Sequence, residues 1–331
     1  MYTSLASTAL LIWKALESYG CDAEVLFKQA GLEPNKMRDP NARYPDAAFL
    51  KLYKRAIEAT KDASFGLTVA RFWHPTSFHA LGYAWLASDS LCDALERATR
   101  YSKILNDKEQ ILLEETDDAF RVVFHNPDPD HPTADEDYDA AFAVTVDLCR
   151  TSYGKEFNPL RVAMTRDAPT DRGAFASVFR APIKYSAQQN ILFLGKQELN
   201  AQLPTANAEL ARANDRIVAD YLARFERGSI KRQVEAKLLE QLSSGHATQE
   251  SIAKALNVST RSLQRKLKQE GTTYKQLLEQ TRRELAAQYV KQSQLSINEI
   301  TFLLGFSEPA NFSRAFKRWT GLSPSEYRLS A

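Results

Sequence analysis

Two short stretches toward the end of the chain carry side chains that are suited to reading DNA bases. Arg261, Gln264 and Arg265 are spaced i, i+3 and i+4, so a helix would bring them to one face. Arginine can bond to guanine O6 and N7, and glutamine can bond to adenine N6 and N7. We therefore predict that this face contacts base edges in the major groove.

The arrangement recurs about 49 residues later, where Arg314 takes the place of Arg265. Pro309 and Ala310 begin the second set and offer no side-chain hydrogen bond, so we expect them to contact thymine methyl groups or to leave base reading to Arg314. Flanking polar and basic side chains are predicted to contact the DNA backbone: Ser259, Thr260, Lys266 and Lys268 in the first copy, and Ser307, Asn311, Lys317 and Arg318 in the second.

Apolar residues spaced three or four apart predict the helices that must position these side chains. The apolar positions are Ile252, Ala253, Leu256, Leu263 and Leu267 in the first copy and Ile300, Leu304, Phe306, Phe312 and Phe316 in the second, with Val258 and Gly305 in the turns. Each copy is predicted to be a helix-turn-helix motif, over about 249–270 and 297–319. A long helix over 274–292 would hold them roughly 34 Å apart, one turn of DNA.

Charge is divided unevenly along the chain. The whole chain has a net charge of +2, but residues after Gly228 contain 16 Lys and Arg against 9 Asp and Glu, a net +7, and the preceding residues contain 27 against 32, a net −5. Clustered basic residues attract phosphate backbones through Coulomb forces and counterion release. An anionic partner is therefore expected for the last third of the chain only.

A length of 331 residues favours two domains. Helices are predicted at 7–19, 22–30, 46–60, 64–72, 77–87 and 90–105, with Asp22, Asp46 and Asp89 as N-caps or as the residues just before them. Strands are predicted at 110–115 and 120–125, as a hairpin, and at 160–165, 183–185 and 191–194, with helices at 136–153, 173–179, 208–225 and 229–243. The predicted fold class is an α+β domain over 1–205, a helical subdomain plus a small mixed sheet, then a linker with a connector helix over 206–228 and an all-α domain over 229–331.

The run GFSEPANFSRAFKRWTGLSPSEYR (305–328), together with LQRKLKQEG of the first copy, resembles the DNA-binding domain of AraC/XylS transcription regulators. The resemblance covers about 100 residues and implies base-reading positions at Arg261, Gln264, Arg265, Pro309, Ala310 and Arg314. Pro309 and Ala310 depart from the more polar pattern often found there. The resemblance further implies double-stranded promoter DNA and RNA polymerase as partners, with activation as the common outcome.

The region before it resembles, over 74–101 and 178–194, the arabinose-binding-like sensor domain of the AraC subgroup that includes ornithine-utilisation and quorum-linked regulators. This implies a small-molecule effector, and nothing in the sequence supports arabinose itself. Aromatic side chains suit an apolar or aromatic effector and arginine suits a carboxylate, although ordinary core packing is the commoner role of such rings. The candidate pocket residues are Phe72, Trp73, Phe78, Tyr83, Trp85, Arg100 and Arg121. A homodimer is expected because Ile217, Tyr221, Leu222 and Phe225 form an apolar stripe near the linker.

Other classes of function are weighed against this interpretation. Cys21, Cys92 and Cys149 are too widely spaced for a zinc site or for the cysteine cluster of DNA-repair methyltransferases, so no cofactor, metal or enzymatic activity is predicted. His125 and His131 lie in an acidic, proline-rich run that is typical of a solvated loop. The alternatives are an enzymatic or metal-binding domain fused to a DNA-binding domain, and a DNA binder without an effector. No apolar run approaches the ~20 residues of a membrane helix, so we expect no membrane partner and a cytoplasmic bacterial protein.

Overall fold

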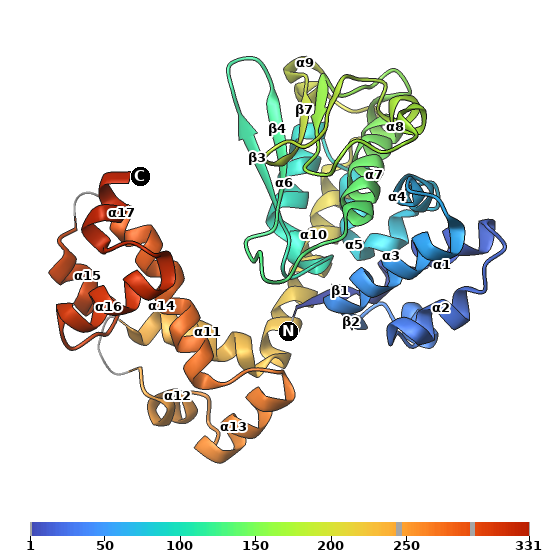
Figure 1. Cartoon of the computed structure of the whole chain (residues 1–331). Coiled ribbons are helices and arrows are strands. Elements are labelled where there is room, and N and C mark those ends of the chain that lie inside the picture. The colour runs from blue at the N-terminus through green and yellow to red at the C-terminus, as the bar shows by residue number, and fades with distance from the viewer. Residues whose placement is uncertain (1, 243–246, 292–294, 331) are drawn as a thin grey trace. The chain divides into compact units, whose positions relative to one another are not determined.

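The computed structural model describes residues 2–242, 247–291 and 295–330, and the chain divides into two compact units (Figure 1). One unit comprises Tyr2–Leu222 and the other comprises the described residues from Ala223 onward. The division falls within a single helix, α10 (Ala208–Gly228), which lies inside the segment expected to link the domains.

The helices of the N-terminal unit begin and end close to where the periodicity predicts them. Asp22 caps its helix by accepting a hydrogen bond from Val25 N at 3.1 Å, and Ser90 caps another by accepting from Asp93 N at the same distance. The helices are α1 (Ala9–Ser18), α2 (Ala23–Ala30), α3 (Asp46–Thr60), α4 (Phe65–Ala70), α5 (His79–Leu86), α6 (Leu91–Tyr101), α7 (Asp135–Tyr153), α8 (Arg172–Phe179) and α9 (Lys196–Asn200). Short 3-10 turns occupy Ala6–Thr8, Pro34–Arg38, Pro75–Phe78 and Ser102–Ile104.

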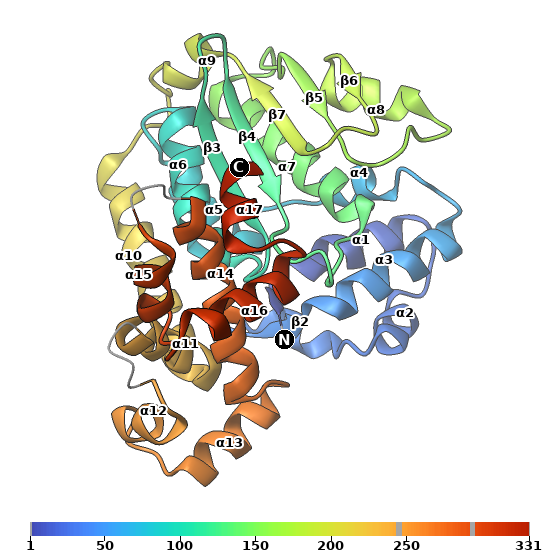
Figure 2. The ribbon, with the colours of Figure 1, turned by 60° about the vertical axis from the view of Figure 1, so that its left-hand side comes forward.

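A five-stranded mixed sheet completes this unit, so the expected α+β class is confirmed. Its strands are β3 (Gln110–Glu115), β4 (Phe120–His125), β5 (Arg161–Ala163), β6 (Ile183–Lys184) and β7 (Asn190–Leu194), in the order β3-β4-β7-β5-β6. Only β5 and β6 pair in parallel, and the predicted hairpin is present as β3 and β4. Phe120 and Val122 belong to the large core that α6 and α7 share, whereas Val123 packs on the opposite face. Figure 2 shows the strands β3, β4 and β7 side by side.

A second sheet and the position of Asp46 were not predicted correctly. Strands β1 (Thr3–Leu5) and β2 (Arg43–Pro45) pair in antiparallel fashion although no strand is expected there. The predicted capping role of Asp46 is also wrong, because Pro45 precedes the helix and Asp46 is its first residue. Asp46 is buried and accepts hydrogen bonds from Asn106 Nδ2 at 2.6 Å and Lys108 Nζ at 2.7 Å. Asp46 is therefore a partner of the buried Lys108, which lies 62 residues later in the chain, and not a helix cap.

The described residues of the C-terminal unit form helices and no strands, as predicted. After the end of α10 the helices are α11 (Ile230–Gln241), α12 (Gln249–Ala255), α13 (Thr260–Gln269), α14 (Tyr274–Lys291), α15 (Ile297–Leu303), α16 (Pro309–Thr320) and α17 (Pro324–Ser330). Helix α14 coincides with the predicted long connector to within one residue. Across the part of the chain that is described, no helix is both long and apolar enough to cross a membrane.

Each helix pair of the C-terminal unit has its own apolar core. Helices α12 and α13 pack with α11 around Leu263 and Leu267, and helices α15 and α16 pack around Phe312 and Phe316. The connector α14 contributes Leu277 to the first core, and its later residues, including Val290, belong to the second. One rigid helix thus joins two small hydrophobic cores, each behind one of the predicted DNA-reading helices.

Candidate functional site

Helix α13 presents its predicted base readers to solvent. Leu263 and Leu267 are fully buried, while the side chains of Arg261, Gln264 and Arg265 are exposed on the opposite side. Ser259 caps the helix by accepting a hydrogen bond from Ser262 N at 3.1 Å. The capped first turn therefore holds all three candidate readers on one accessible surface.

Helix α16 repeats the arrangement with a different turn. Gly305 has φ +66°, and an added Cβ would lie 2.9 Å from the carbonyl oxygen of Leu242, so the turn requires glycine. Pro309 is the first helical residue, where its missing N–H costs no hydrogen bond. Arg314 is exposed and donates to Asn311 Oδ1 at 2.7 Å. A side chain predicted to contact the DNA backbone thus orients the candidate base reader.

The two turns are related but not identical. The left-handed residue of the first turn is Asn257, with φ +54°, and its counterpart is Gly305. Helix α13 begins three residues after Asn257, whereas α16 begins four residues after Gly305. The second turn therefore contains one extra residue.

A carboxylate fixes helix α13 to its neighbour. Glu270, at the end of α13, accepts hydrogen bonds from Ser229 Oγ at 2.8 Å, Ile230 N at 2.9 Å and Lys231 N at 3.1 Å. These donors lie at the start of α11, where backbone N–H groups lack partners within the helix and favour a negative charge. Glu270 thereby sets the position of the whole reading helix.

Two charged residues of α14 fix the position of the second motif. Arg282 donates to the carbonyl oxygens of Leu304, at 2.8 Å, and Gly305, at 2.6 Å. Glu279 accepts from Trp319 Nε1 at 3.0 Å and from Arg318 at 2.7 Å. Arg318 was predicted to contact the DNA backbone, and in this structure its charge is partly neutralised by Glu279. Sequence reasoning missed these positioning residues because their partners lie 22 to 40 positions away.

The other basic candidates are available to an anion. Among the described residues, Arg261, Arg265, Lys266, Lys268 and Lys317 have no acidic partner, and all are exposed. Ser259, Thr260 and Ser307 lie beside them in or next to the two turns. The C-terminal unit therefore presents unpaired cationic side chains on both reading helices.

The N-terminal unit contains a cavity of about 220 Å³. Helices α1, α5, α6 and α7 and strands β3 and β4 contribute to its walls, which are mainly apolar. Rings and aliphatic side chains line most of it, including Leu11, Ile12, Phe49, Phe78, Leu81, Trp85, Leu105, Ile111, Phe124, Val144 and Leu148. This is the composition expected for a small-molecule site.

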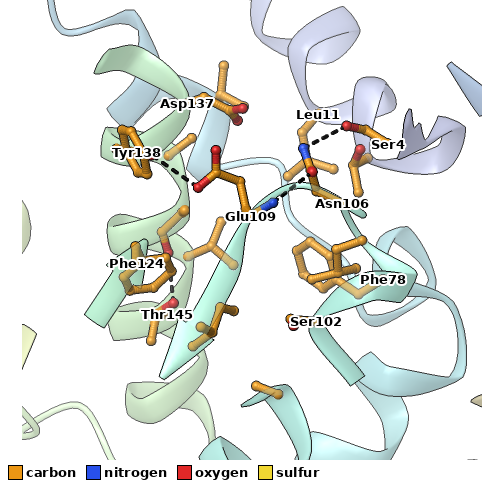
Figure 3. Close-up of a pocket in the computed structure, with 18 of the residues that line it drawn as sticks. Ser4, Leu11, Phe78, Ser102, Asn106, Glu109, Phe124, Asp137, Tyr138 and Thr145 are labelled. Atoms are coloured by element: carbon orange, nitrogen blue, oxygen red, sulfur yellow. Dashed lines mark hydrogen bonds between the residues drawn. The ribbon is translucent and has the colours of Figure 1, made fainter. Parts of the chain in front are cut away.

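Polar groups gather at one end of the cavity (Figure 3). The carboxylates of Glu109 and Asp137 lie close together there with Tyr138 beside them, and the rings of Phe78 and Phe124 lie farther along. Tyr138 donates to Glu109 Oε2 at 3.0 Å, and Tyr53 donates to Asp137 Oδ1 at 3.3 Å.

Burial and the nearby carboxylates of Asp46 and Glu109 raise the pKa of Asp137 to about 7. Lys108 is the cation close to these groups. Its ammonium is fully buried, bonds to Asp46 and lies 3.6 Å from Glu109 Oε1. Asp137 can therefore change its charge near neutral pH.

The predicted pocket residues divide into two groups. Phe78 and Trp85 line the cavity, whereas Phe72, Trp73, Tyr83, Arg100 and Arg121 are not among its lining residues. Arg121 lies on the face of β4 opposite Phe124, where it pairs with Glu114 at 3.0 Å. Alternation along the strand thus directs this arginine away from the cavity.

Sequence reasoning missed Glu109, Asp137 and Tyr138. Asp137 falls within the helix predicted at 136–153, and Asp137, Val144 and Leu148 are spaced i, i+7 and i+11 on one helix face. That spacing was the available signal that Asp137 faces inward with the apolar residues of α7.

Two contacts connect the walls of the cavity to α10 within the N-terminal unit. Arg97 of α6 pairs with Asp215 at 3.1 Å, and both side chains are largely buried. The ring of His79, at the start of α5, lies 5.0 Å from the ring of Tyr221. Tyr221 is 3% exposed, so it does not belong to an accessible apolar stripe as predicted, whereas Ile217 is 49% exposed.

Histidine and cysteine side chains are the candidates for a metal or thiol site. Within the described residues, no group of three or more His, Cys, Asp or Glu side chains is placed to hold a metal ion. His131 instead bonds to Asp128 at 2.9 Å, and Cys21, Cys92 and Cys149 are free thiols. Burial raises the pKa of the Cys149 thiol, which disfavours the reactive thiolate.

Both units match known protein families. Residues 20–203 match the arabinose-binding N-terminal domain of AraC transcription regulators, and residues 252–330 match a helix-turn-helix domain. The ornithine utilization regulator of Pseudomonas aeruginosa is 28% identical over 94% of this chain and 91% of its own length. The regulator VqsM of the same organism is 24% identical over 96% of each chain. The urease operon transcriptional activator of Escherichia coli is 33% identical over 33% of this chain and 37% of its own length.

Proposed function

Since the chain belongs to the AraC family of DNA-binding transcription regulators, we propose that α13 and α16 read promoter bases and that an effector in the N-terminal cavity controls this binding. The observation that carries the proposal is the pair of reading helices, each with an apolar back and an exposed cationic front. Arg261, Gln264 and Arg265 supply most of the sequence discrimination, since Pro309 and Ala310 leave Arg314 as the strong reader of the second motif.

Selection of bound DNA from a random library by the full-length chain tests this function. We expect two preferred blocks of bases whose centres lie about one helical turn apart, ~10 bp. The block read by α13 should be the more strongly specified. Retention of DNA without enrichment of any sequence would contradict the proposal and favour a nonspecific DNA binder.

Control by the effector requires a ligand to have different affinities for two arrangements of the protein. The supporting observation is that α5 and α6, which line the cavity, also contact α10 through His79 and Arg97. Helix α10 continues into the C-terminal unit. A change in the walls of the cavity can thereby alter the connector.

We further propose that the protein activates transcription through RNA polymerase, acts as a homodimer in the bacterial cytoplasm and has no enzymatic activity. The transcriptional activator among its relatives supports the first point. A reporter fused to the selected DNA site would separate activation from repression. Expression that falls when the protein is supplied would overturn the activator role and leave DNA binding intact.

A further inference from the structure

Building on the proposed effector-binding function, we propose that the cavity takes an apolar molecule that bears one protonated amine, with the amine seated at Glu109 and Asp137. Three observations support this assignment: the charge of the lining, the arrangement of the acidic end, and a buried donor elsewhere in the wall.

The lining of the cavity is acidic. Its residues include Glu109 and Asp137 and contain no lysine, arginine or histidine. The nearby ammonium of Lys108 bonds to Asp46 Oδ2 at 2.7 Å and to the carbonyl oxygen of His131 at 3.1 Å. One cation thus stands against three carboxylates. A ligand carboxylate would add to this excess of negative charge, whereas an ammonium would offset it.

The two carboxylates are held ready to accept further hydrogen bonds. Thr133 and Tyr138 each donate to Glu109, and Tyr53 donates to Asp137. An ionised carboxylate offers about four acceptor positions, so both groups keep free ones, and an ammonium has three donors to fill them. The hydroxyl groups of Tyr53 and Tyr138 thus hold the two carboxylates, and Figure 3 shows Tyr138 beside Glu109.

Trp85 supplies an independent sign of a ligand. It lines the cavity and is 4% exposed, yet its indole Nε1–H has no hydrogen-bond acceptor among the described residues. A buried donor of this kind normally has a partner. We therefore expect the molecule to carry a hydrogen-bond acceptor, such as a hydroxyl oxygen, in addition to its amine.

The volume limits the size of the apolar body. A cavity of about 150 Å³ can hold benzene, and this one is about 220 Å³. The larger volume leaves room for one aromatic ring that carries a short chain. Tyramine has such a ring, an ammonium and a phenolic oxygen, and it is the probe that we choose for the class.

Binding of three matched probes to the full-length chain tests the inference by isothermal titration calorimetry. Tyramine carries an ammonium, tyrosol replaces it with a hydroxyl group, and 3-(4-hydroxyphenyl)propionate carries a carboxylate. We expect tyramine to bind at least tenfold more tightly than tyrosol, and the carboxylate to bind most weakly. Phenethylamine, which lacks the phenolic oxygen, should bind more weakly than tyramine, and Trp85→Phe should remove that difference.

An aspartate variant localises the amine. Asp137→Asn should weaken tyramine at least tenfold and leave tyrosol within threefold, whereas Asp117→Asn, on an exposed turn, should change neither. Tyrosol or the carboxylate binding as tightly as tyramine would overturn the amine class while leaving an effector site in place. Failure of all three probes to bind would overturn the assignment of the cavity to this class. The selection of bound DNA tests the regulator function separately. The comparison of the three probes uses the wild-type chain, so its outcome does not depend on whether a variant folds.

Discussion

At the scale of single residues, the reading helices separate specificity from affinity. Arg265 is an exposed arginine in the middle of α13, and Lys317 is an exposed lysine late in α16. Arginine can form two directed bonds to guanine, whereas lysine interacts with phosphate largely as a point charge. The two substitutions should therefore have different consequences for DNA binding.

Arg265→Ala should reduce discrimination at one base pair by about 1–3 kcal/mol. Lys317→Ala should weaken binding to specific and random DNA alike and lower the salt slope by about 1. Fluorescence anisotropy with the selected site and a scrambled duplex, over a range of salt concentrations, measures both. Equal loss on both duplexes for the two variants would contradict this division of roles.

Asp137 should make stability depend on pH. Burial, with the charges of Asp46 and Glu109, raises the pKa of Asp137 to about 7, against roughly 4 for an aspartate in an unfolded chain. The folded protein then binds more protons than the unfolded chain between these values, so stability falls as pH rises through this window. Tyr53 and Lys108 also face this group and partly offset the shift.

Asp137→Asn should therefore raise the free energy of unfolding at pH 8 by about 1–3 kcal/mol and change it little near pH 4. Urea denaturation at several pH values measures the difference, with Asp117→Asn as the exposed control. In the wild type, tyramine should bind more tightly at pH 8 than at pH 6, because its ammonium favours the ionised Asp137. Parallel stability curves for wild type and Asp137→Asn would show that this group is not the cause.

At the scale of elements, side chains from neighbouring helices fix the reading helices. Glu270 accepts two backbone hydrogen bonds at the start of α11, and removal of a helix cap typically costs about 0.5–2 kcal/mol. Glu270→Ala should therefore speed hydrogen exchange at residues 229–242 and weaken DNA binding. Glu240→Ala removes a negative charge from the far end of α11 and should change neither the hydrogen exchange nor the DNA binding. Unchanged exchange in Glu270→Ala would show that the cap is dispensable.

The Arg97–Asp215 pair should stabilise the junction of α6 with α10. Its side chains are 12% and 16% exposed, and Arg97 also bonds to Ser88 Oγ at 3.1 Å. Arg97 also pairs with Asp93, so Asp215→Asn leaves Arg97 with one carboxylate partner, whereas removal of Arg97 leaves Asp215 as an uncompensated, largely buried charge. Asp215→Asn should accelerate hydrogen exchange in residues 208–222, and so should Arg97→Gln. The double variant should exchange no faster than the faster of the two single variants. Additive effects would mean that the two side chains act separately.

The elements were more predictable than the cavity, for a physical reason. The helices of both motifs follow from apolar residues spaced three or four apart, because the contacts involved are local. The acidic end of the cavity combines Glu109, just before β3, with Asp137 on α7, and it is supported by Asp46 of α3, which bonds to Asn106 in the turn before Glu109. One sequence does not reveal such distant pairings. Arg121 was likewise assigned to the pocket because its strand face was unknown.

At the scale of the whole molecule, helix α10 carries both the contacts proposed for coupling and the face proposed for dimerisation. It carries Tyr221 and Asp215 on the face that packs into the N-terminal unit. It also exposes Leu210, at 50%, and Ile217, at 49%, two helical turns apart. Large apolar side chains repeated along an exposed helix face are suited to pairing with a second copy. The stripe predicted for dimerisation thus shifts from Tyr221 to Leu210 and Ile217.

Substitution of this face should dissociate the expected dimer. Light scattering of the wild type at micromolar concentration should give about twice the chain mass of 37.3 kDa. Leu210→Asp with Ile217→Asp should give a single chain mass, because two charges would be buried without partners at the interface. The exposed Asp220→Asn serves as a control on the same helix. A dimer that survives the double substitution would assign assembly to another surface, and a wild type of single mass with and without DNA would exclude the homodimer.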